Sequence, residues 1–389
     1  MTAQGPHILL MANGILGWKT YSQQVAAVMA SRADLRSAVH WRRPSGLCTA
    51  FVKRHDVSGR LLRWLRCQDP IHAYRGRLGA DIRRELTEHA PEIVHFASHW
   101  PSGALLDMAD APPFTVSLDC TRANIERDFG FGIWTLPEME READLLRSAA
   151  RIYPMSHWAA DSLVGDYGID PARIRIIPPA QNLTAFKPKR SHDGPPNIVF
   201  IGNDFVRKGG PRLVEWVQGP LAGRCHLHIV SADPMAMVRG PDITAHGRVP
   251  HADLIARLLP KMDMMCLPTE LDMSPHVLVE AAAARLPVVA SRLGGIADIV
   301  LNGRSGILAD IDSDADFIAA LTQLIEAPDL RRCMGEAAFR HARTAFDADT
   351  VYSQMIDEIC AAASMQDAAI FAPYVPQGVG VLNASRQPG

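Results

Sequence analysis

Residues 266–308 read CLPTELDMSPHVLVEAAAARLPVVASRLGGIADIVLNGRSGIL, and this stretch decides the fold class. An apolar run that ends at Leu267 predicts a strand, and a polar loop follows it. Ser274 and Pro275 then open an alanine-rich helix, and a second apolar run at 287–290 predicts the next strand. Strand, helix and strand in this order are typical of a parallel sheet covered by helices.

The same alternation of short apolar runs and longer amphipathic stretches continues along the chain. The expected strands are 7–11, 92–96, 114–118, 151–154 and 173–177 in the first half, and 197–201, 226–230, 262–267 and 287–290 in the second. The sequence therefore predicts an α/β protein with two Rossmann-like, doubly wound lobes that face a central cleft. Ligands bind such sheets at the carboxyl ends of the strands, so we expect the site in the loops that follow them.

A break in this pattern predicts the boundary between the lobes. Residues 178–196 are rich in Pro, Lys and polar residues and lack apolar periodicity, which is typical of a linker. A last helical pattern at 350–363 follows the second lobe. The expected organisation is an N-terminal lobe at 1–180, a linker at 181–196, a second lobe at 197–345, a C-terminal helix at 346–365 and a flexible tail at 366–389.

Composition is that of an ordinary folded protein, because 48% of the 389 residues are apolar, 21% are charged and the formal net charge is −2. So small a charge gives no indication of nucleic-acid binding. No apolar run approaches the roughly 20 residues that a membrane span needs, and the N-terminus lacks the pattern of a signal peptide. We therefore expect a cytoplasmic protein. The seven cysteines are scattered without a CxxC pair, so neither a zinc site nor disulfides are expected.

One segment, 32–84, departs from this charge balance. It holds thirteen Lys or Arg and four Asp, interleaved with aromatic residues that include Trp41, Phe51 and Trp64. Basic and aromatic residues mixed in this way can hold an anionic membrane surface, which would place the protein peripherally at the inner face of a membrane. A solvated charged face over a small core explains the pattern equally well.

Two glycine-containing loops follow expected strands. The first reads MANGILGWKTYSQQ (11–24) and places Gly14 and Gly17 before a helix expected to begin near Thr20. Glycines there let the backbone approach a phosphate at a helix N-terminus. GxGxxG is not satisfied, and a tight structural turn explains the same residues.

The second glycine loop reads NIVFIGNDFVRKGGPRLVEW (197–216), a strand and a turn at Gly202 followed by Arg207 and Lys208 at the start of a helix. A fixed basic pair at a helix N-terminus suits a diphosphate leaving group, whose negative charge must be offset as a bond to it breaks. A solvated surface pair is the alternative.

Acidic residues follow the strand that ends at Leu267. Glu270 and Asp272 lie in the loop, and Glu280 lies inside the alanine-rich helix, where a carboxylate can accept two hydrogen bonds from a ribose diol. Glu270 and Asp298 are equally explained as helix caps.

Taken together, these motifs resemble a known family. The order RKG before a helix, then LPxxxDxxxxxxxEAxAxxxPVVAS, GGxxDIV and NGxSG resembles the retaining glycosyltransferases of family 4, which have the GT-B fold. The resemblance covers 150–345 well, including SHWAADSLVGDYGIDPARIRIIPP, and the N-terminal lobe more loosely. It implies a hexosyl transferase that moves a sugar from a nucleotide-diphosphate donor, bound mainly by the second lobe, to an acceptor hydroxyl.

The resemblance also implies roles for single residues. Arg207 and Lys208 correspond to the pair that holds the donor diphosphate, Glu280 to the carboxylate on the ribose, and Asp272 to an acid beside the transferred sugar. The full set of expected donor-binding residues is Gly17, Gly202, Arg207, Lys208, Arg248, Met273, Ser274, Pro275, His276 and Glu280. No metal or other cofactor is expected, because the family uses protein cations for the diphosphate.

Candidates on the first lobe are Asp119 and two histidines. His95, at the end of an expected strand, and His99, in the loop after it, should face the cleft; His99 is the better candidate for contacting the acceptor, and His95 is equally explained as a buried core residue. Asp119 stands where the family often has a catalytic-cleft His. Asp272 and Asp298 likewise replace Glu, and Arg285 stands where a helix-ending Gly is usual.

These departures leave the donor base and sugar open. The sequence does not identify the acceptor; the resemblance implies a sugar, a glycolipid or another small molecule, as expected for a role in cell-surface polysaccharide or glycolipid synthesis. Two rival hypotheses remain: a sugar-nucleotide epimerase on a similar fold, and a non-catalytic nucleotide-sugar-binding protein. A dehydrogenase is disfavoured because its glycine fingerprint is missing.

Overall fold

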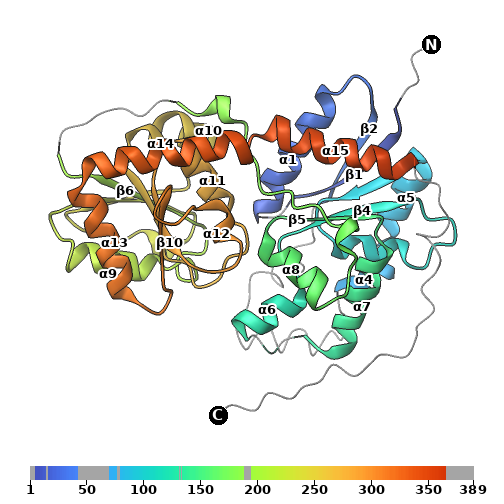
Figure 1. The fold of residues 1–389 in the computed structure, drawn as a ribbon, viewed down its shortest axis with the longest axis horizontal. Helices are drawn as coiled ribbons and strands as arrows, with labels where there is room; N and C mark the ends of the chain where they lie inside the picture. The colour runs from blue at the N-terminus through green and yellow to red at the C-terminus, as the bar shows by residue number, and fades with distance from the viewer. Residues whose placement is uncertain are drawn as a thin grey trace.

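The computed structural model describes residues 5–14, 16–42, 70–76, 79–130, 132, 134–187 and 194–364. Within them the chain forms two sheets of parallel strands, each flanked by helices, which lie side by side (Figure 1). The prediction of two doubly wound lobes is confirmed. The expected tail at 366–389 and most of the basic segment, from 43 to 69, lie outside the described residues.

The first lobe is built on a sheet with strand order β2-β1-β3-β4-β5. Its strands are β1 (His7–Asn13), β2 (Arg36–Arg42), β3 (Ile93–Phe96), β4 (Phe114–Leu118) and β5 (Arg151–Pro154). Its helices are α1 (Leu16–Ser31), α4 (Pro70–Arg75), α5 (Ala80–His89), α6 (Arg122–Phe129), α7 (Leu136–Ser148) and α8 (His157–Gly165), with a short 3-10 helix, η2 (Trp100–Leu105). The central strands are fully buried, which explains their continuous apolar runs.

The second lobe has the strand order β11-β10-β9-β6-β7-β8. Its strands are β6 (Asn197–Ile201), β7 (His226–Val230), β8 (Ile243–Gly247), β9 (Met264–Leu267), β10 (Val288–Ser291) and β11 (Gly306–Ala309). Its helices are α9 (Gly210–Gln218), α10 (His251–Asp253), α11 (His276–Ala283), α12 (Ile296–Ile299), α13 (Asp314–Glu326) and α14 (Pro328–Ala345). The chain order reverses beside β6, so the loops after β6 and β9 lie next to each other.

One expected strand, 173–177, is wrong. The chain there makes a 3-10 turn at Pro171–Arg173 and a single bridge between Ile152 and Ile174. Arg173 donates to the carbonyl of Arg147 at 2.7 Å at the end of α7, and the backbone N–H groups of Arg175 and Ile177 bond to β5 without forming a regular strand. Helix α1 also begins earlier than expected, at Leu16. Strands β2, β8 and β11 were not expected, because they are short or lack a clean apolar run.

The last helix, α15 (Ala348–Ser364), returns to the first lobe and lies beside α1 (Figure 1). Its buried Tyr352 packs edge-to-face on Tyr21 of α1, with ring centroids 5.4 Å apart. The chain therefore crosses between the lobes twice, and the crossings are joined because Gln181 exchanges backbone hydrogen bonds with Phe346 and Ala348. This paired crossing connects the two faces of the cleft.

Candidate functional site

An ion pair between Lys208 and Asp272 lies where the loops after β6 and β9 meet. Lys208 Nζ is 2.8 Å from Asp272 Oδ2, and each side chain is 14% exposed. Gly202 leaves room for the Lys208 side chain, since a Cβ at 202 would lie 2.5 Å from Lys208 Cδ and the lysine would have to shift. A shielded ammonium group held by a single carboxylate can be drawn to a stronger anion such as a diphosphate.

Arg207 is placed differently from its neighbour. Its Nε donates to Asp204 Oδ2 at 2.8 Å, and its Nη1 donates to the carbonyl of Leu271. Its own carbonyl accepts the backbone N–H of Glu270 at 2.9 Å. Arg207 therefore fastens the loop after β6 to the loop after β9, and its guanidinium is already engaged before any ligand arrives.

The N-terminus of α11 presents polar atoms without partners. Pro275 occupies the N-cap and has no side-chain acceptor, so no side chain of the N-cap bonds to the first backbone amides of the helix. Within the described residues, buried Ser274 Oγ and His276 Nδ1 have no hydrogen-bond partner. Burial lowers the pKa of His276 to about 4, so its ring is neutral near pH 7. Buried polar atoms of this kind indicate a place where a ligand supplies the missing bonds.

Gly17 of the first lobe lies directly across from this helix. A Cβ at Gly17 would lie 3.2 Å from His276 Cδ2. Met273, also in the expected donor loop, accepts the backbone N–H of Gly295 at 2.6 Å. The structure therefore brings Gly17, Met273, Ser274, Pro275 and His276 together around one end of α11.

Glu280 is buried further along α11, at 4% exposure. Its Oε1 lies 3.0 Å from His251 Nε2, and this hydrogen bond raises the pKa of His251. Arg248 is exposed in the loop that leads from β8 to His251. Sequence reasoning did not find His251, whose only local signal is that it opens a short helix after Pro250.

On the first lobe, Asp119 directly follows β4. Burial raises the pKa of its carboxyl group, hydrogen bonds from Cys120 and from the backbone and the charge of His99 oppose this, and the charge of Asp272 adds to the rise. Cys120 Sγ is 3.5 Å from Asp119 Oδ1. The carboxylate of Asp272, on the second lobe, thus acts electrostatically on Asp119 of the first lobe.

The two histidines of the first lobe differ in position. His99 Nε2 lies 2.7 Å from Oε1 of the fully buried Glu142, which also accepts hydrogen bonds from the backbone N–H of Arg122 and from Tyr167. His95 does not face the cleft as expected. It is fully buried, 2.9 Å from Thr115 Oγ1, and burial lowers its pKa to about 3. The core explanation therefore applies to His95, while His99, also buried at 6% exposure, is held by Glu142 and acts electrostatically on Asp119.

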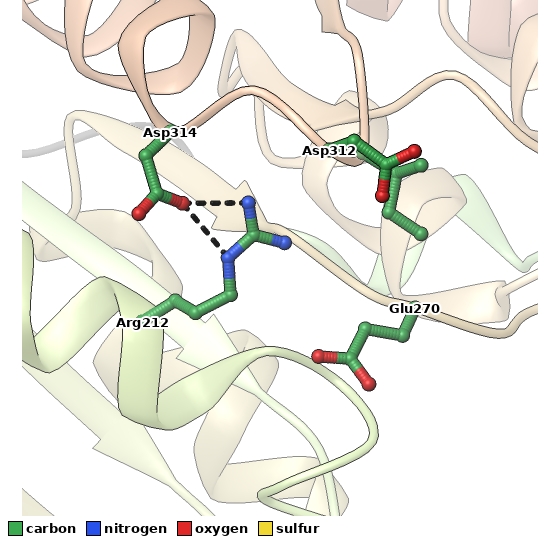
Figure 2. Close-up of a pocket in the computed structure, with 5 residues that line it drawn as sticks. Arg212, Glu270, Asp312 and Asp314 are labelled. Carbon is green, nitrogen blue, oxygen red and sulfur yellow. Dashed lines mark hydrogen bonds and ion pairs between the residues drawn. The ribbon is translucent and has the colours of Figure 1, made fainter.

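A separate pocket of about 510 Å³ opens on the second lobe. Figure 2 shows Arg212, Glu270, Asp312 and Asp314 around it, with the Arg212 guanidinium bonded to Asp314. Three carboxylates beside one cation repel a diphosphate, and none of the expected donor residues lines this pocket. Glu270 belongs here and not with Asp272. Throughout the described part of the chain, no three His, Cys, Asp or Glu side chains are placed to hold a metal ion.

Two family models match the chain, and each covers one lobe. The model described as Glycosyltransferase Family 4 matches residues 44–184, and the model described as Glycosyl transferases group 1 matches residues 195–327. The chain belongs to the family 4 glycosyltransferases.

Curated relatives carry this family's names. A D-inositol 3-phosphate glycosyltransferase 2 of Catenulispora acidiphila is 28% identical over 261 residues, which cover 56% of the chain and 59% of that relative. A D-inositol 3-phosphate glycosyltransferase of Geodermatophilus obscurus is 25% identical over 327 residues, covering 75% of the chain and 71% of the relative. The match with the Catenulispora protein thus spans less than two thirds of its length.

Solved structures show the fold. Sucrose-phosphate synthase from Thermosynechococcus elongatus superposes with a TM-score of 0.72 at 16% identity, covering 91% of this chain and 98% of that one. The Anabaena protein HepE, solved in complex with UDP-glucose, gives 0.69 at 15% identity, covering 92% and 100%. The family 4 chain therefore has the GT-B fold. None of the described helices is both long and apolar enough to cross a membrane.

Proposed function

We propose that the protein is a retaining hexosyltransferase that takes a sugar from a nucleoside-diphosphate sugar and passes it to an acceptor hydroxyl. The observation that carries the proposal is the set of groups around α11: the Lys208–Asp272 pair, the unpartnered Ser274 Oγ and His276 Nδ1, and buried Glu280. Together they offer a cation for phosphate, amides at a helix N-terminus and a carboxylate for a diol. The solved relative with bound UDP-glucose has the same fold.

In this mechanism, the second lobe binds the nucleotide while the cleft excludes water. Lys208 leaves Asp272 and approaches the diphosphate, where a positive charge is worth most as the glycosidic bond breaks. Arg207 contributes by holding the loop on which Lys208 sits. Asp272 and Asp119 then lie on opposite sides of the transferred sugar, as acceptors for its hydroxyl groups. No metal ion takes part in the proposed reaction.

The proposed acceptor side rests on two residues of the first lobe. His99 and Asp119 stand at the carboxyl ends of β3 and β4, the position where an acceptor would enter from the first lobe. The names of the relatives suggest D-inositol 3-phosphate as a first probe, followed by sugars and glycolipids. A role in cell-surface polysaccharide or glycolipid synthesis would follow from a lipid-linked or polymeric acceptor.

The test has two stages. A thermal-shift screen of UDP, GDP and their sugars should show stabilisation that grows with ligand occupancy. Product analysis by NMR, with and without EDTA, then reports the anomeric configuration and any dependence on metal. Donor binding without turnover over a broad acceptor panel would instead favour the non-catalytic binding protein, and conversion of the donor alone to another sugar nucleotide would favour the epimerase.

Peripheral membrane contact is a separate proposal that rests on the basic segment at 32–84. Co-sedimentation with vesicles should require acidic lipid and weaken as salt rises, because charge attraction is screened over about 10 Å at 0.1 M salt. Equal recovery with neutral and acidic vesicles would leave the solvated-face explanation and favour a soluble acceptor.

A further inference from the structure

The hydrogen bond between His251 and Glu280 has no part in the donor site as described so far. His251 Nε2 lies 3.0 Å from Glu280 Oε1. The carboxylate side chain is 6% exposed, whereas the imidazole side chain is 50% exposed. A buried acceptor therefore meets a solvent-facing donor, and the contact occupies one of the two oxygens that Glu280 can offer.

Both residues lie in helices, so the rotation of the Glu280 carboxyl group is the degree of freedom that a further contact can restrict. Glu280 lies in α11 among the buried residues Leu278, Val279 and Ala281, so its main chain is held by helix hydrogen bonds and core packing. Its terminal torsion is soft, since the carboxyl group of Glu rotates over a broad range. His251 is the first residue of α10, reached from β8 through the loop that carries Arg248. A bond from this second element is what can hold the carboxyl group in one orientation.

We propose that His251 is a positioning residue for the donor nucleotide: by holding Oε1 of Glu280, it turns Oε2 toward the ribose diol of a nucleoside diphosphate. This inference rests on the proposed donor site. The chemistry is specific to ribose, because a vicinal diol donates two hydrogen bonds and a fixed carboxylate accepts them in one geometry. A freely rotating carboxylate would have to be ordered by the ligand, at the expense of affinity.

The contact also makes ribose recognition depend on pH. The hydrogen bond to Glu280 raises the pKa of His251, burial opposes this, and the charge of Glu280 adds to it. The nearby Asp253 is paired with Arg257 at 3.3 Å, so Glu280 is the charged group that acts on His251. His251 therefore keeps its charge to a higher pH than a free imidazole, and its hold on Glu280 weakens as pH rises through that raised pKa.

The experiment measures ribose recognition alone. Isothermal titration of the full chain with UDP and with 2′-deoxy-UDP, at pH 6 and pH 8.5, gives the ratio of the two dissociation constants. Phosphate ionisation is the same in both ligands and cancels in the ratio. A hydrogen bond to a charged group predicts a preference of about tenfold or more for UDP at pH 6, falling at pH 8.5. If the protein binds GDP instead, GDP and 2′-deoxy-GDP take their place.

Two variants separate positioning from folding. His251→Ala removes the hydrogen-bond donor to Glu280. The preference for UDP over 2′-deoxy-UDP should then fall to about twofold, with UDP binding weakened and 2′-deoxy-UDP binding nearly unchanged. His251→Gln keeps an N–H donor at the same reach, so it should restore most of the preference but remove its dependence on pH. His226→Gln is the matched control, because His226 lies in the same lobe and bonds to Thr244 at 2.8 Å.

Each other outcome overturns the inference in its own way. Tighter UDP binding in His251→Ala would show that the imidazole blocks Glu280. Equal loss of UDP and 2′-deoxy-UDP would show that His251 acts elsewhere than on the ribose. A wild-type protein that discriminates the two ligands, with variants that do so equally well, would refute the role of His251 but keep the donor site. A wild-type protein that binds neither diphosphate would refute the donor site itself.

Discussion

Asp298 of the second lobe binds the N-terminus of helix α8 of the first lobe, where Ser156 is the N-cap and His157 the first helical residue. Asp298 Oδ2 accepts the backbone N–H of His157 at 2.6 Å, and its Oδ1 lies 3.2 Å from His157 Nδ1. A carboxylate at a helix N-terminus is favourable both as a hydrogen-bond acceptor and against the helix dipole. A Cβ added at the neighbouring Gly295 would lie 2.6 Å from the Cβ of Ser156, so only glycine fits at this contact between the lobes.

This contact predicts that Asp298→Ala loosens the closed arrangement of the lobes. Loss of a helix cap costs about 1 kcal/mol, which is enough to shift a closed population about fivefold. Small-angle scattering should show a larger radius of gyration, and the KM for the donor should rise. Asp329→Ala, an exposed carboxylate on α14, is the control. An unchanged scattering profile together with an unchanged KM would mean that Asp298 does not hold the lobes together.

Lys208 and Arg207 should differ in how they affect turnover. Lys208→Met removes the cation proposed to move onto the diphosphate, and kcat should fall by about 100-fold, a typical loss for one electrostatic contact in a closed site. Arg207→Met breaks the bonds to Asp204 and Leu271, so both thermal stability and turnover should fall. Steady-state kinetics and thermal melts distinguish them. Full turnover in Lys208→Met would remove that residue from the mechanism.

Substitutions of Glu280 and Asp272 should affect different steps, donor binding and sugar transfer respectively. Glu280 is proposed to bind the ribose in both ground and transition states, so Glu280→Gln should raise KM and weaken the free nucleotide while kcat changes little. Asp272 lies beside the transferred sugar, so Asp272→Asn should mainly lower kcat. Because Asp272 also restrains Lys208, its loss should leave nucleotide affinity equal or higher. Weak nucleotide binding by Asp272→Asn would instead show that Asp272 is a structural residue of the loop before α11.

The sequence predicted the strands correctly where complete burial gives a continuous apolar run. Strands such as β4 and β6 are buried almost throughout, so their apolar runs match the observed bounds. Strand β2 was missed because it lies at the sheet edge, where alternate residues face solvent and basic side chains obscure the apolar pattern.

The sequence predicted which site residues lie in loops after neighbouring strands, but not their contacts with other elements. Motif order placed Lys208, Asp272 and Glu280 in one lobe, since they follow adjacent strands. Contacts between elements distant in sequence carry no such signal: His251 with Glu280, or His99 with Glu142, are seen only once the chain has folded. For the same reason, Arg207 looked like a free cation until its bonds to its own loop were visible.

Glu142 should be a source of stability that depends on pH. Its carboxylate is fully buried and accepts hydrogen bonds from His99, Arg122 and Tyr167. Removing the charge from a buried, paired group is expected to destabilise the fold by about 3–5 kcal/mol, so Glu142→Gln should unfold at lower urea at pH 7. Glu140→Gln, exposed on the same helix, should change little.

The pH dependence follows from the direction of the pKa shift at Glu142. Burial acts to raise the pKa, but His99, Arg122 and Tyr167 outweigh it and leave the pKa of Glu142 lowered. A lowered pKa adds stability that is fully present above the unfolded value of about 4.3 and is lost as pH falls through the folded value. Urea unfolding at pH 7, 5 and 3.5 should therefore show the difference between the wild type and Glu142→Gln shrinking below pH 4.3. A difference that stays constant down to pH 3.5 would assign the effect to shape and packing, and would leave His99 without a charged partner in the folded protein.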